Sequence, residues 1–181
     1  MRKQKTIFMK IIKAKPEDYQ RIRLFYHSVI DAIQGQKYLP GWRKDIYPDP
    51  DDLKQEIAEG CLYYGLVDGE MAAAMVVNQQ CHEEYQNAKW RIDAAPDEFM
   101  VIHILAVHPR FGRQGLAKEL VHFALDLARN AGMKAVRLDV LKGNLPAEKL
   151  YPGLGFEYIE TRPMFYEDVG VMEFELFEFG L

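Results

Sequence analysis

The stretch from Val101 to Ala131 constrains the fold more than any other part of the chain, because a buried strand, a tight turn and a helix follow one another there. The strand is predicted over residues 99–107, which are apolar on both faces except for His103. The helix shows apolar residues at helical spacing: Leu116, Leu120, Ala124, Leu127, Ala128 and Ala131. Gly132 is placed to cap its end.

The turn before this helix carries Gly112, Gly115 and Ala117. A helix N-terminus presents unpaired N–H groups and the positive end of the helix dipole, and small residues let an anion approach the backbone directly. The pattern therefore predicts a site for phosphate, and a diphosphate fits it. A tight turn with close packing is the alternative interpretation.

The spacing of the small residues distinguishes this turn from two common phosphate-binding loops. A P-loop continues after its first glycine with four residues and Gly-Lys-Ser/Thr, whereas this chain has Ala117, Lys118 and Glu119 there. A dinucleotide fingerprint requires a second glycine where this chain has Gln114. The sequence thus argues against a nucleotide triphosphatase and against a dinucleotide-binding protein.

A second motif follows at residues 144–156, with the sequence Asn-Leu-Pro-Ala-Glu-Lys-Leu-Tyr-Pro-Gly-Leu-Gly-Phe. It resembles the motif Asn-x-x-Ala-x-x-x-Tyr-x-x-x-Gly-Phe of the GNAT N-acetyltransferases at every defined position. The turn Gly112-x-x-Gly115-x-Ala117 resembles the acyl-CoA pyrophosphate loop of the same family, Gln/Arg-x-x-Gly-x-Gly/Ala. Gly112 departs from that loop, so Arg110 or Arg113 is the candidate to replace the missing side chain.

The resemblance implies a single-domain α/β fold of the GNAT type over residues 1–181, with a mixed, mostly antiparallel central sheet, flanking helices and an N-terminal extension at residues 1–8. It implies acetyl-CoA as acyl donor. The backbone of Leu105, Ala106 and Val107 would hold its pantetheine arm. The loop that would hold its diphosphate consists of Gly112, Arg113, Gln114, Gly115, Leu116, Ala117 and Lys118.

Two residues of the second motif acquire roles through the same resemblance. Asn144 would orient the pantetheine arm or nearby backbone, and the Tyr151 hydroxyl would face the thioester sulfur. The structural alternatives are a helix N-cap for Asn144 and a core aromatic for Tyr151. Pro152 lacks an N–H and restricts the residue before it, so the short helix is predicted to kink or end there.

Acetyl transfer to an amine requires a group that accepts a proton. The resemblance places this chemistry beside the strand of His103, whose ordinary pKa suits the task. Strict alternation puts the side chains of Val101, His103 and Leu105 on one face of the strand, and of these three only His103 is titratable. His103 is therefore the first candidate for the base, and a hydrogen-bonded core histidine is the alternative.

Two carboxylates are further candidates. Glu98 begins the same strand, but alternation turns it to the face opposite His103 unless a bulge intervenes. Asp139 lies on the neighbouring strand, on a polar face with Arg137, where an ion pair or a surface position would also explain it. Glu98 is taken as the second candidate for the base and Asp139 as a weaker one.

Specificity is expected to come from residues 36–52 and 79–97. Both segments combine aromatic and acidic residues: Tyr38, Trp42, Tyr47, Asp45, Asp49, Asp51 and Asp52 in the first, and Tyr85, Trp90, Glu83 and Glu84 in the second. Such a combination binds a cation through ring faces and charge. In the alternative interpretation the tryptophans close the core and the acids are solvated. The second segment is long for a loop, so a substrate lid or a short helix is expected.

Composition restricts the partners. The net charge is −4 and no basic stripe with interleaved aromatics occurs, which argues against nucleic acid and mildly favours cationic substrates. The apolar stretch after the basic residues 1–5 is too brief for a signal peptide or a membrane span, so a cytoplasmic protein without a membrane partner is expected. Cys61 and Cys81 fit neither a disulfide framework nor a zinc site, and no metal is expected.

The remaining elements follow from periodicity and turn residues: strands at 9–14, 62–67, 71–78, 135–141, 157–161 and 171–179, and helices at 16–35 and 50–59. Asp68-Gly69-Glu70 is the strongest hairpin signal. The main hypothesis is an acetyl-CoA-dependent N-acetyltransferase acting on a primary amine of a small molecule or peptide, with a homodimer left open. A non-catalytic acyl-CoA-binding regulator and an interaction module are the alternatives.

Overall fold

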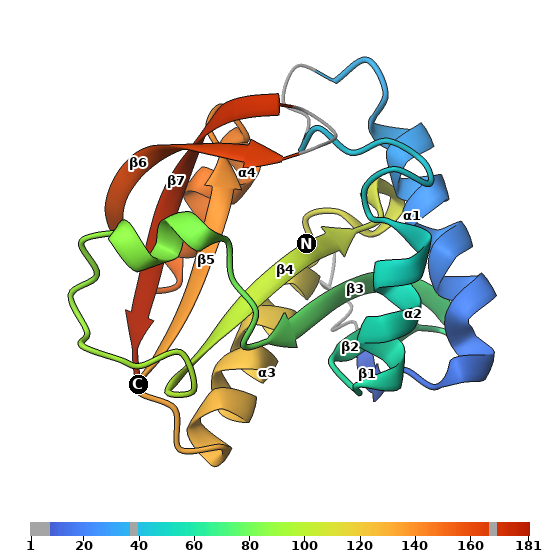
Figure 1. Ribbon diagram of the computed structural model, residues 1–181. Helices are drawn as coiled ribbons and strands as arrows, with labels where there is room; N and C mark the ends of the chain where they lie inside the picture. The colour runs from blue at the N-terminus through green and yellow to red at the C-terminus, as the bar shows by residue number, and fades with distance from the viewer. Residues whose placement is uncertain (1–7, 37–39, 167–169) are drawn as a thin grey trace, which may run out of the picture.

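The computed structural model describes residues 8–36, 40–166 and 170–181. The predicted extension, residues 1–8, therefore lies outside the described residues except for Phe8. Tyr38 of the first predicted specificity segment also lies outside them. The strands are β1 (Lys10–Lys13), β2 (Leu62–Val67), β3 (Glu70–Asn78), β4 (Phe99–Val107), β5 (Ala135–Leu141), β6 (Glu157–Tyr166) and β7 (Gly170–Gly180) (Figure 1). The α-helices are α1 (Tyr19–Ile33), α2 (Pro50–Ala58), α3 (Leu116–Asn130) and α4 (Leu145–Gly153). Short 3-10 helices span Pro16–Asp18, Glu83–Asn87 and Pro109–Phe111.

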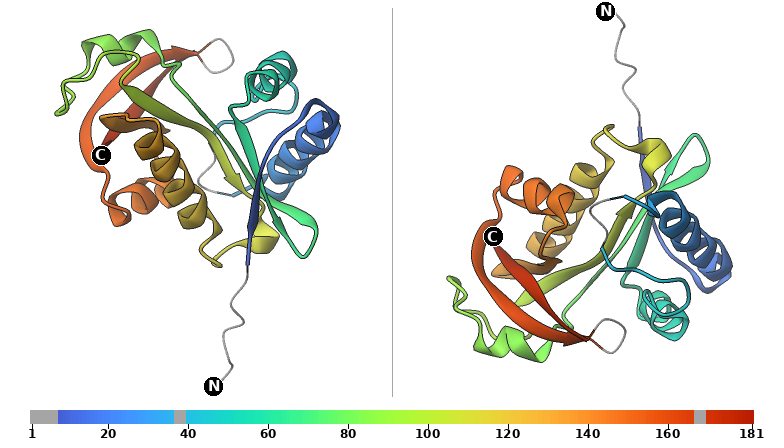
Figure 2. Two further views of the ribbon diagram at one scale, coloured as in Figure 1. Left: turned by 90° about the horizontal axis from the view of Figure 1, so that it is seen from below. Right: turned by 90° about the horizontal axis from the view of Figure 1, so that it is seen from above.

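The strands form one seven-stranded sheet in the order β1-β2-β3-β4-β5-β7-β6. Neighbouring strands are antiparallel except for β4 and β5, which are parallel. Helices α1 and α2 cover one face of the sheet and α3 packs on the other (Figure 2). The predicted mixed, mostly antiparallel α/β sheet with flanking helices is thereby confirmed.

The two parallel strands separate along most of their length. Only Phe99–Val101 of β4 pairs with Ala135–Arg137 of β5, and beyond this point the strands diverge (Figure 1). On its other edge β4 stays paired with β3 at residues 101–103 and 106–107. The sheet therefore has an opening near its centre, and one backbone edge of β4 faces it.

A β-bulge in β4 lies at this opening. The pairing with β3 shifts register between Ala74 and Val76, and Ile104 has a φ of 43°. The hydroxyl of Tyr26 on α1 donates a hydrogen bond to the Ile104 carbonyl at 3.0 Å. Ile104 consequently packs toward α1, whereas Leu105 packs toward α3. The prediction that Leu105 shares a face with His103 is wrong, because the bulge reverses the alternation.

The ends of two helices position residues at the opening. Asp49 caps α2 by accepting hydrogen bonds from the backbone N–H groups of Asp51 and Asp52. Asn144 occupies the N-cap position of α4, but its side chain makes no capping hydrogen bond. Helix α4 ends at Gly153, one residue after Pro152, as the missing N–H of proline predicts.

Residues 79–97 form a support for the sheet and contain the short helix Glu83–Asn87. Tyr85 is buried, and the Trp90 indole donates to its backbone carbonyl at 2.7 Å. The guanidinium of Arg137 lies 4.4 Å from the centre of the Trp90 ring. Of the two interpretations, the short helix is the correct one, and Trp90 belongs to the packing of the fold. Within the described ranges, no helix has both the length and the apolar character needed to span a membrane.

Candidate active site

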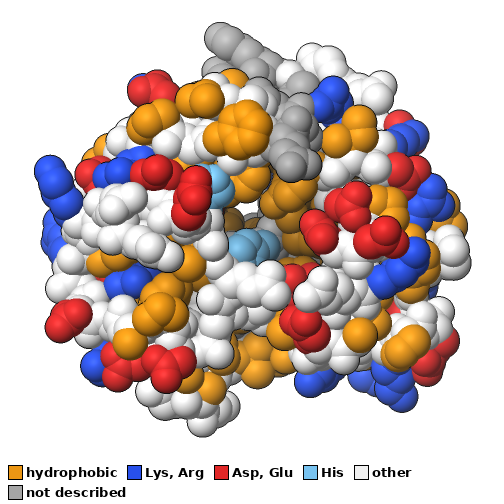
Figure 3. Space-filling model, in the orientation of Figure 1, with side chains coloured by type: hydrophobic (Ala, Val, Ile, Leu, Met, Phe, Trp, Pro, Cys, Tyr) orange, Lys and Arg blue, Asp and Glu red, His pale blue; other side chains and the backbone are white. Residues whose placement is uncertain are grey.

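Two adjoining cavities occupy the opening between β4 and β5. The α4 cavity, of about 130 Å³, extends to Asn144 and Tyr151. The α2 cavity, of about 280 Å³, extends to Glu56 and is close in size to small-molecule pockets, which begin at about 300 Å³. The residues that line both cavities are Tyr47, His103, Ile104, Asp139 and Tyr166. Figure 3 shows the hollow on the surface, with histidine side chains in it.

His103 is held in place by one ring nitrogen. Its Nε2 lies 2.9 Å from Oδ1 of Asn78 and 3.0 Å from the carbonyl oxygen of Gln80. A carbonyl oxygen only accepts, so Nε2 carries the proton, and the lone pair of the neutral ring resides on Nδ1. Burial lowers the pKa of His103, and the nearby Asp139 opposes this shift in part. The neutral ring is therefore favoured.

Asn78 is itself oriented by two further groups. Its Nδ2 donates to Oε1 of Glu56 at 2.8 Å, and its Oδ1 accepts from the backbone N–H of Gln80 at 2.9 Å. These partners fix which end of the amide faces His103. The hydrogen-bonded chain thus runs from Glu56 on α2 through Asn78 on β3 to His103 on β4.

Asp139 is half-buried, and Arg137 is not its partner. It lines both cavities from β5, and the Tyr85 hydroxyl donates to its Oδ2 at 2.8 Å. Burial raises the pKa of this carboxyl, and the hydrogen bond from Tyr85 opposes the increase. Arg137 instead forms a buried ion pair with Glu178 at 3.0 Å. The expected ion pair with Arg137 and the expected surface position of Asp139 are both corrected, because residues 79–97 cover that face of β5.

Tyr151 and Asn144 reach the α4 cavity from α4. The ring of Tyr151 is buried against Phe156 and Phe177. Its hydroxyl makes no hydrogen bond with any residue that the structure describes, and burial raises its pKa, so the phenol stays protonated. The core interpretation of Tyr151 is confirmed for its ring, and the residue also lines the α4 cavity.

The predicted phosphate loop is open to solvent. Residues 112–115 are exposed, and no side chain caps α3 at Gly115, whose φ is 83°. A Cβ added to Gly115 would meet no atom within 4 Å. Arg110 pairs with Glu70, whereas Arg113 and Lys118 form no ion pair with the described residues. The side chain of Leu116 is buried, so only its backbone N–H is available for an anion.

Glu98 is separated from the cavities. It precedes β4 at the end of the strand where β4 and β5 are paired, and it lines neither cavity. Its carboxylate accepts from Nζ of Lys134 at 2.8 Å and from the N–H of Ala95 at 2.9 Å. The contact with Lys134 lowers the pKa of Glu98, which makes it a weaker base. The prediction of Glu98 as second candidate is corrected accordingly.

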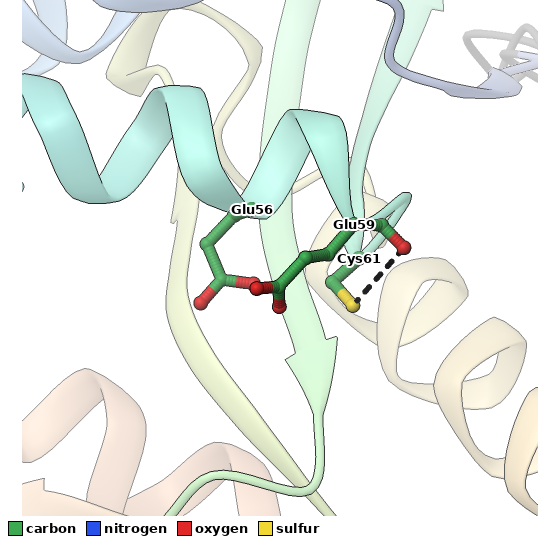
Figure 4. Close-up of side chains that lie close together, drawn as sticks. All are labelled: Glu56, Glu59 and Cys61. Carbon is green, nitrogen blue, oxygen red and sulfur yellow. Dashed lines mark hydrogen bonds between the residues drawn. The ribbon is translucent and has the colours of Figure 1, made fainter.

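Glu56, Glu59 and Cys61 bring one ligand atom each to within 4.8 Å of one another (Figure 4). Glu59 is exposed and accepts from Gln55 at 2.8 Å, and the Cys61 thiol faces the Glu59 carbonyl at 3.8 Å. Burial raises the pKa of the Cys61 thiol, whereas a metal ligand requires the thiolate. We therefore assign no metal to this group, and treat Glu56 as part of the α2 cavity.

Several residues at the opening were missed by sequence reasoning. Neither Glu56 nor Asn78 has a motif around it, and Tyr26 resembles any apolar residue on the buried face of α1. The signal that could have found Asn78 is a lone polar residue at the end of an apolar strand. Trp42 and Tyr47, by contrast, line the α4 cavity from the first predicted specificity segment.

Comparisons with known proteins agree with the fold. A GNAT-family acetyltransferase from Streptococcus agalactiae superposes with a TM-score of 0.76 at 21% identity, over 96% of this chain and 95% of that one. The structure of yncA, a putative acetyltransferase from Salmonella typhimurium with its cofactor acetyl-CoA, gives 0.67 at 18% identity, over 96% and 94%. At these identities the likeness shows the fold.

Among curated proteins, the ribosomal protein bS18-alanine N-acetyltransferase of Haemophilus ducreyi is 37% identical over 62 residues. The match covers 34% of this chain and 43% of that protein, so less than half of the relative's length is spanned. The model of the acetyltransferase (GNAT) family matches residues 27–156. Because this match extends over more than half of the chain, the protein belongs to the acetyltransferase (GNAT) family.

Proposed function

We propose that this protein transfers the acetyl group of acetyl-CoA to a primary amine of a small molecule or peptide by direct attack on the thioester. The observation that carries the proposal is the α4 cavity, in which the opening of the sheet brings His103 of β4 and Tyr151 of α4 to one space. One residue suits proton acceptance and the other proton donation, which are the two proton transfers that the reaction needs.

The residues present fit acetyl-CoA. The uncapped N-terminus of α3 and the exposed loop before it suit a diphosphate, with Arg113 and Lys118 as nearby charges. The β4 edge from Leu105 to Val107 is free of β5 and would hold the pantetheine arm. Asn144 lines the α4 cavity beyond it. When bound, acetyl-CoA supplies the acetyl group as a thioester, whose C–S bond breaks as the C–N bond to the amine forms.

His103 is the proposed base. Its Nε2–H is held by Gln80 and Asn78, so Nδ1 is the atom that accepts a proton from the amine. The lowered pKa keeps this nitrogen unprotonated near neutral pH. Asp139, on the facing strand, stabilises the imidazolium that results, because the two side chains line the same cavities and interact electrostatically.

Tyr151 is the proposed acid. Its phenol remains protonated because burial raises its pKa, and its hydroxyl has no partner among the described residues. It can therefore donate a proton or a hydrogen bond to the departing thiolate. The Phe156 and Phe177 rings restrict the tyrosine ring and so orient the hydroxyl.

The test combines two measurements on the purified protein. Calorimetric titration with acetyl-CoA measures binding, and a panel of primary amines is scored by release of the CoA thiol. Binding together with amine-dependent thiol release supports the proposal. Binding without turnover of any amine would favour an acyl-CoA-binding regulator, and absence of binding would contradict the assignment of the loop at Gly115.

A further inference from the structure

We infer that the amine acceptor is an alkyl diamine or polyamine without a carboxylate, bound in the α2 cavity through its second positive charge. The inference rests on the proposed acetyltransferase function and adds the substrate class. It is based on the side chains that line the α2 cavity, on one buried carboxylate oxygen and on the distance from that carboxylate to His103.

The α2 cavity is acidic. Four carboxyl groups line it: Asp49, Asp52, Glu56 and Asp139. Among the described residues, its lining includes no lysine and no arginine. In Figure 3, acidic side chains over α2 border one side of the hollow. Tyr47 and Tyr166 add aromatic rings to the same lining, so the cavity combines the two features that bind organic cations.

Within the described ranges, none of these four carboxyl groups forms an ion pair with a lysine or arginine, unlike acids elsewhere in the protein. Asp45, in the loop before α2, is paired with Arg23 and His27, which hold its pKa at about 2. Burial raises the pKa of Asp52 and of Glu56, and neighbouring carboxyl groups add to the increase. The protein thus leaves negative charge in the cavity that a ligand cation would balance.

Glu56 is the clearest case. Its Oε1 accepts from Asn78, but its Oε2 is buried and makes no hydrogen bond with the described residues. A buried carboxylate oxygen without a hydrogen-bond partner is destabilising, because its loss of hydration is not compensated. A ligand ammonium in the α2 cavity would offset that cost through charge, with a small adjustment of the side chain.

The position of Glu56 fits a molecule with two amines. The path from Oε1 of Glu56 to Nε2 of His103 consists of two hydrogen bonds, of 2.8 and 2.9 Å, and one amide group. The two atoms are therefore at most about 8 Å apart, given standard bond lengths. One nitrogen of a short diamine can lie at His103 and Asp139 for acetylation while the other lies beside Glu56 and Asp52.

The same lining disfavours amino acids. A free carboxylate in the α2 cavity would meet Asp52, Glu56 and Asp139, and the described lining offers no lysine or arginine to pair with it. Like charges in a partly buried site repel each other strongly. Two amines of equal chain length, one with a carboxylate and one without, should therefore be distinguished by the protein.

Three acceptors test the inference, each as the variable substrate with saturating acetyl-CoA. 1,5-Diaminopentane carries both amines, 1-aminopentane lacks the second amine, and lysine adds a carboxylate to the diamine. We expect kcat/KM for 1,5-diaminopentane to exceed that of each of the others by about tenfold or more, the effect of one charge-assisted hydrogen bond. Equal values for all three would overturn the inference while leaving the acetyltransferase function intact.

A matched pair of variants tests whether the preference for the diamine arises in the α2 cavity. Asp52→Asn removes a charge from the cavity lining, whereas Asp51→Asn removes the charge of the next residue of α2, which lines neither cavity and pairs with Lys54. The ratio of kcat/KM for 1,5-diaminopentane to that for 1-aminopentane should fall about two- to fivefold in Asp52→Asn, because this residue is exposed. It should not change in Asp51→Asn. The ratio cancels effects on the chemical step, which is common to both amines.

Glu56→Gln keeps an oxygen for Asn78 and should lower the same ratio by about tenfold. An unchanged ratio in both Glu56→Gln and Asp52→Asn contradicts the inference. A wild-type protein that acetylates other primary amines of the panel but none of these three contradicts the inference alone, whereas one that binds acetyl-CoA and acetylates no primary amine contradicts both the inference and the proposed function. Turnover of 1-aminopentane or lysine without preference for the diamine contradicts the substrate class alone.

Discussion

At His103, the same hydrogen bonds that hold the ring also determine its chemistry. Nε2 is occupied by Gln80 and Asn78, so the ring cannot turn without losing two hydrogen bonds, and Nδ1 is left as the acceptor. The structural and catalytic interpretations of this histidine are therefore compatible. The two interpretations predict different results when the imidazole ring is replaced by glutamine, whose amide can still donate a hydrogen bond but cannot accept the proton.

His103→Gln is expected to lower kcat/KM by about 10²–10⁴-fold and to remove the ionisation on the acid side of the pH profile. In the unmodified protein, the acid limb of the pH–rate profile should have its midpoint below the ordinary histidine pKa, because burial lowers the pKa of His103. Activity is lost as pH falls through that value, since the protonated ring cannot accept a proton. His122→Gln, at an exposed position on α3, serves as control and should match the parent. An unchanged pH profile in His103→Gln, with only a lower melting temperature, would assign His103 a structural role.

Tyr151→Phe removes one hydroxyl and keeps the ring between Phe156 and Phe177. If the hydroxyl acts on the departing thiolate, kcat should fall by about 10²–10⁴-fold while KM for acetyl-CoA stays nearly constant. Single-turnover kinetics measures the chemical step without interference from product release. Tyr158→Phe, which removes a hydroxyl bonded to Thr161 on β6, is the matched control. A chemical step within about twofold of the parent would show that another group or water protonates the sulfur.

The sequence predicts where a residue lies when a continuous motif surrounds it, and fails when distant segments form its environment. Tyr151 and Asn144 belong to one continuous motif, and both line the α4 cavity. Asp139 was underrated because alternation in β5 indicates a polar face, whereas that face is covered by Tyr85 and its neighbours. Glu98 was overrated because proximity in sequence to His103 says nothing about Lys134, which binds it.

At the scale of elements, the N-terminus of α3 has the features of an anion site without any contribution from side chains. Its first N–H groups lack a side-chain cap, and Gly115 leaves open space where a Cβ would project. A larger residue at Gly115 would fill that space. It would also have to adopt a φ of 83°, so binding and stability must be measured separately.

Gly115→Val is expected to abolish acetyl-CoA binding in calorimetric titration, because the side chain blocks the approach of the diphosphate. Gly132→Val is the matched control at the other end of α3: it too has a positive φ, 70°, and open space around the added Cβ. Both variants should lose about 1–2 kcal/mol of unfolding free energy from backbone strain. Parental affinity in folded Gly115→Val would contradict the assignment of the loop.

Element boundaries show where sequence patterns suffice. The predicted bounds of β2, β4 and β5 agree with the structure, because long apolar or alternating runs end at turn residues. Strand β6 was predicted to end at residue 161 but continues to Tyr166 through Pro163, which is tolerated because β6 is an edge strand. The bulge at Ile104 could not be predicted, since no glycine marks it and the hydrogen bond from Tyr26 comes from a distant helix.

For the molecule as a whole, the opening between β4 and β5 requires the other end of these strands to be held firmly. Arg137 connects the segments that meet at this end of the strands. Its guanidinium lies 4.2 Å from the centre of the Phe99 ring and 4.4 Å from that of Trp90, donates to the Ile92 carbonyl at 2.8 Å, and pairs with Glu178. This arrangement joins β4, β5, β7 and residues 79–97 where β4 and β5 still pair.

Arg137→Met is therefore expected to lower the free energy of unfolding by about 3–5 kcal/mol, because it leaves the Glu178 carboxylate buried without its cation. Arg91→Met, which breaks an exposed pair with Glu157, should cost at most about 1 kcal/mol. Urea denaturation measures both, and the double variant Arg137→Met/Glu178→Gln should recover part of the loss. Since Arg137 lines neither cavity, the folded variant should bind acetyl-CoA with parental affinity. A cost for Arg137→Met no larger than that for Arg91→Met would show that the opening is supported by the hydrophobic core around α3 and not by this ion pair.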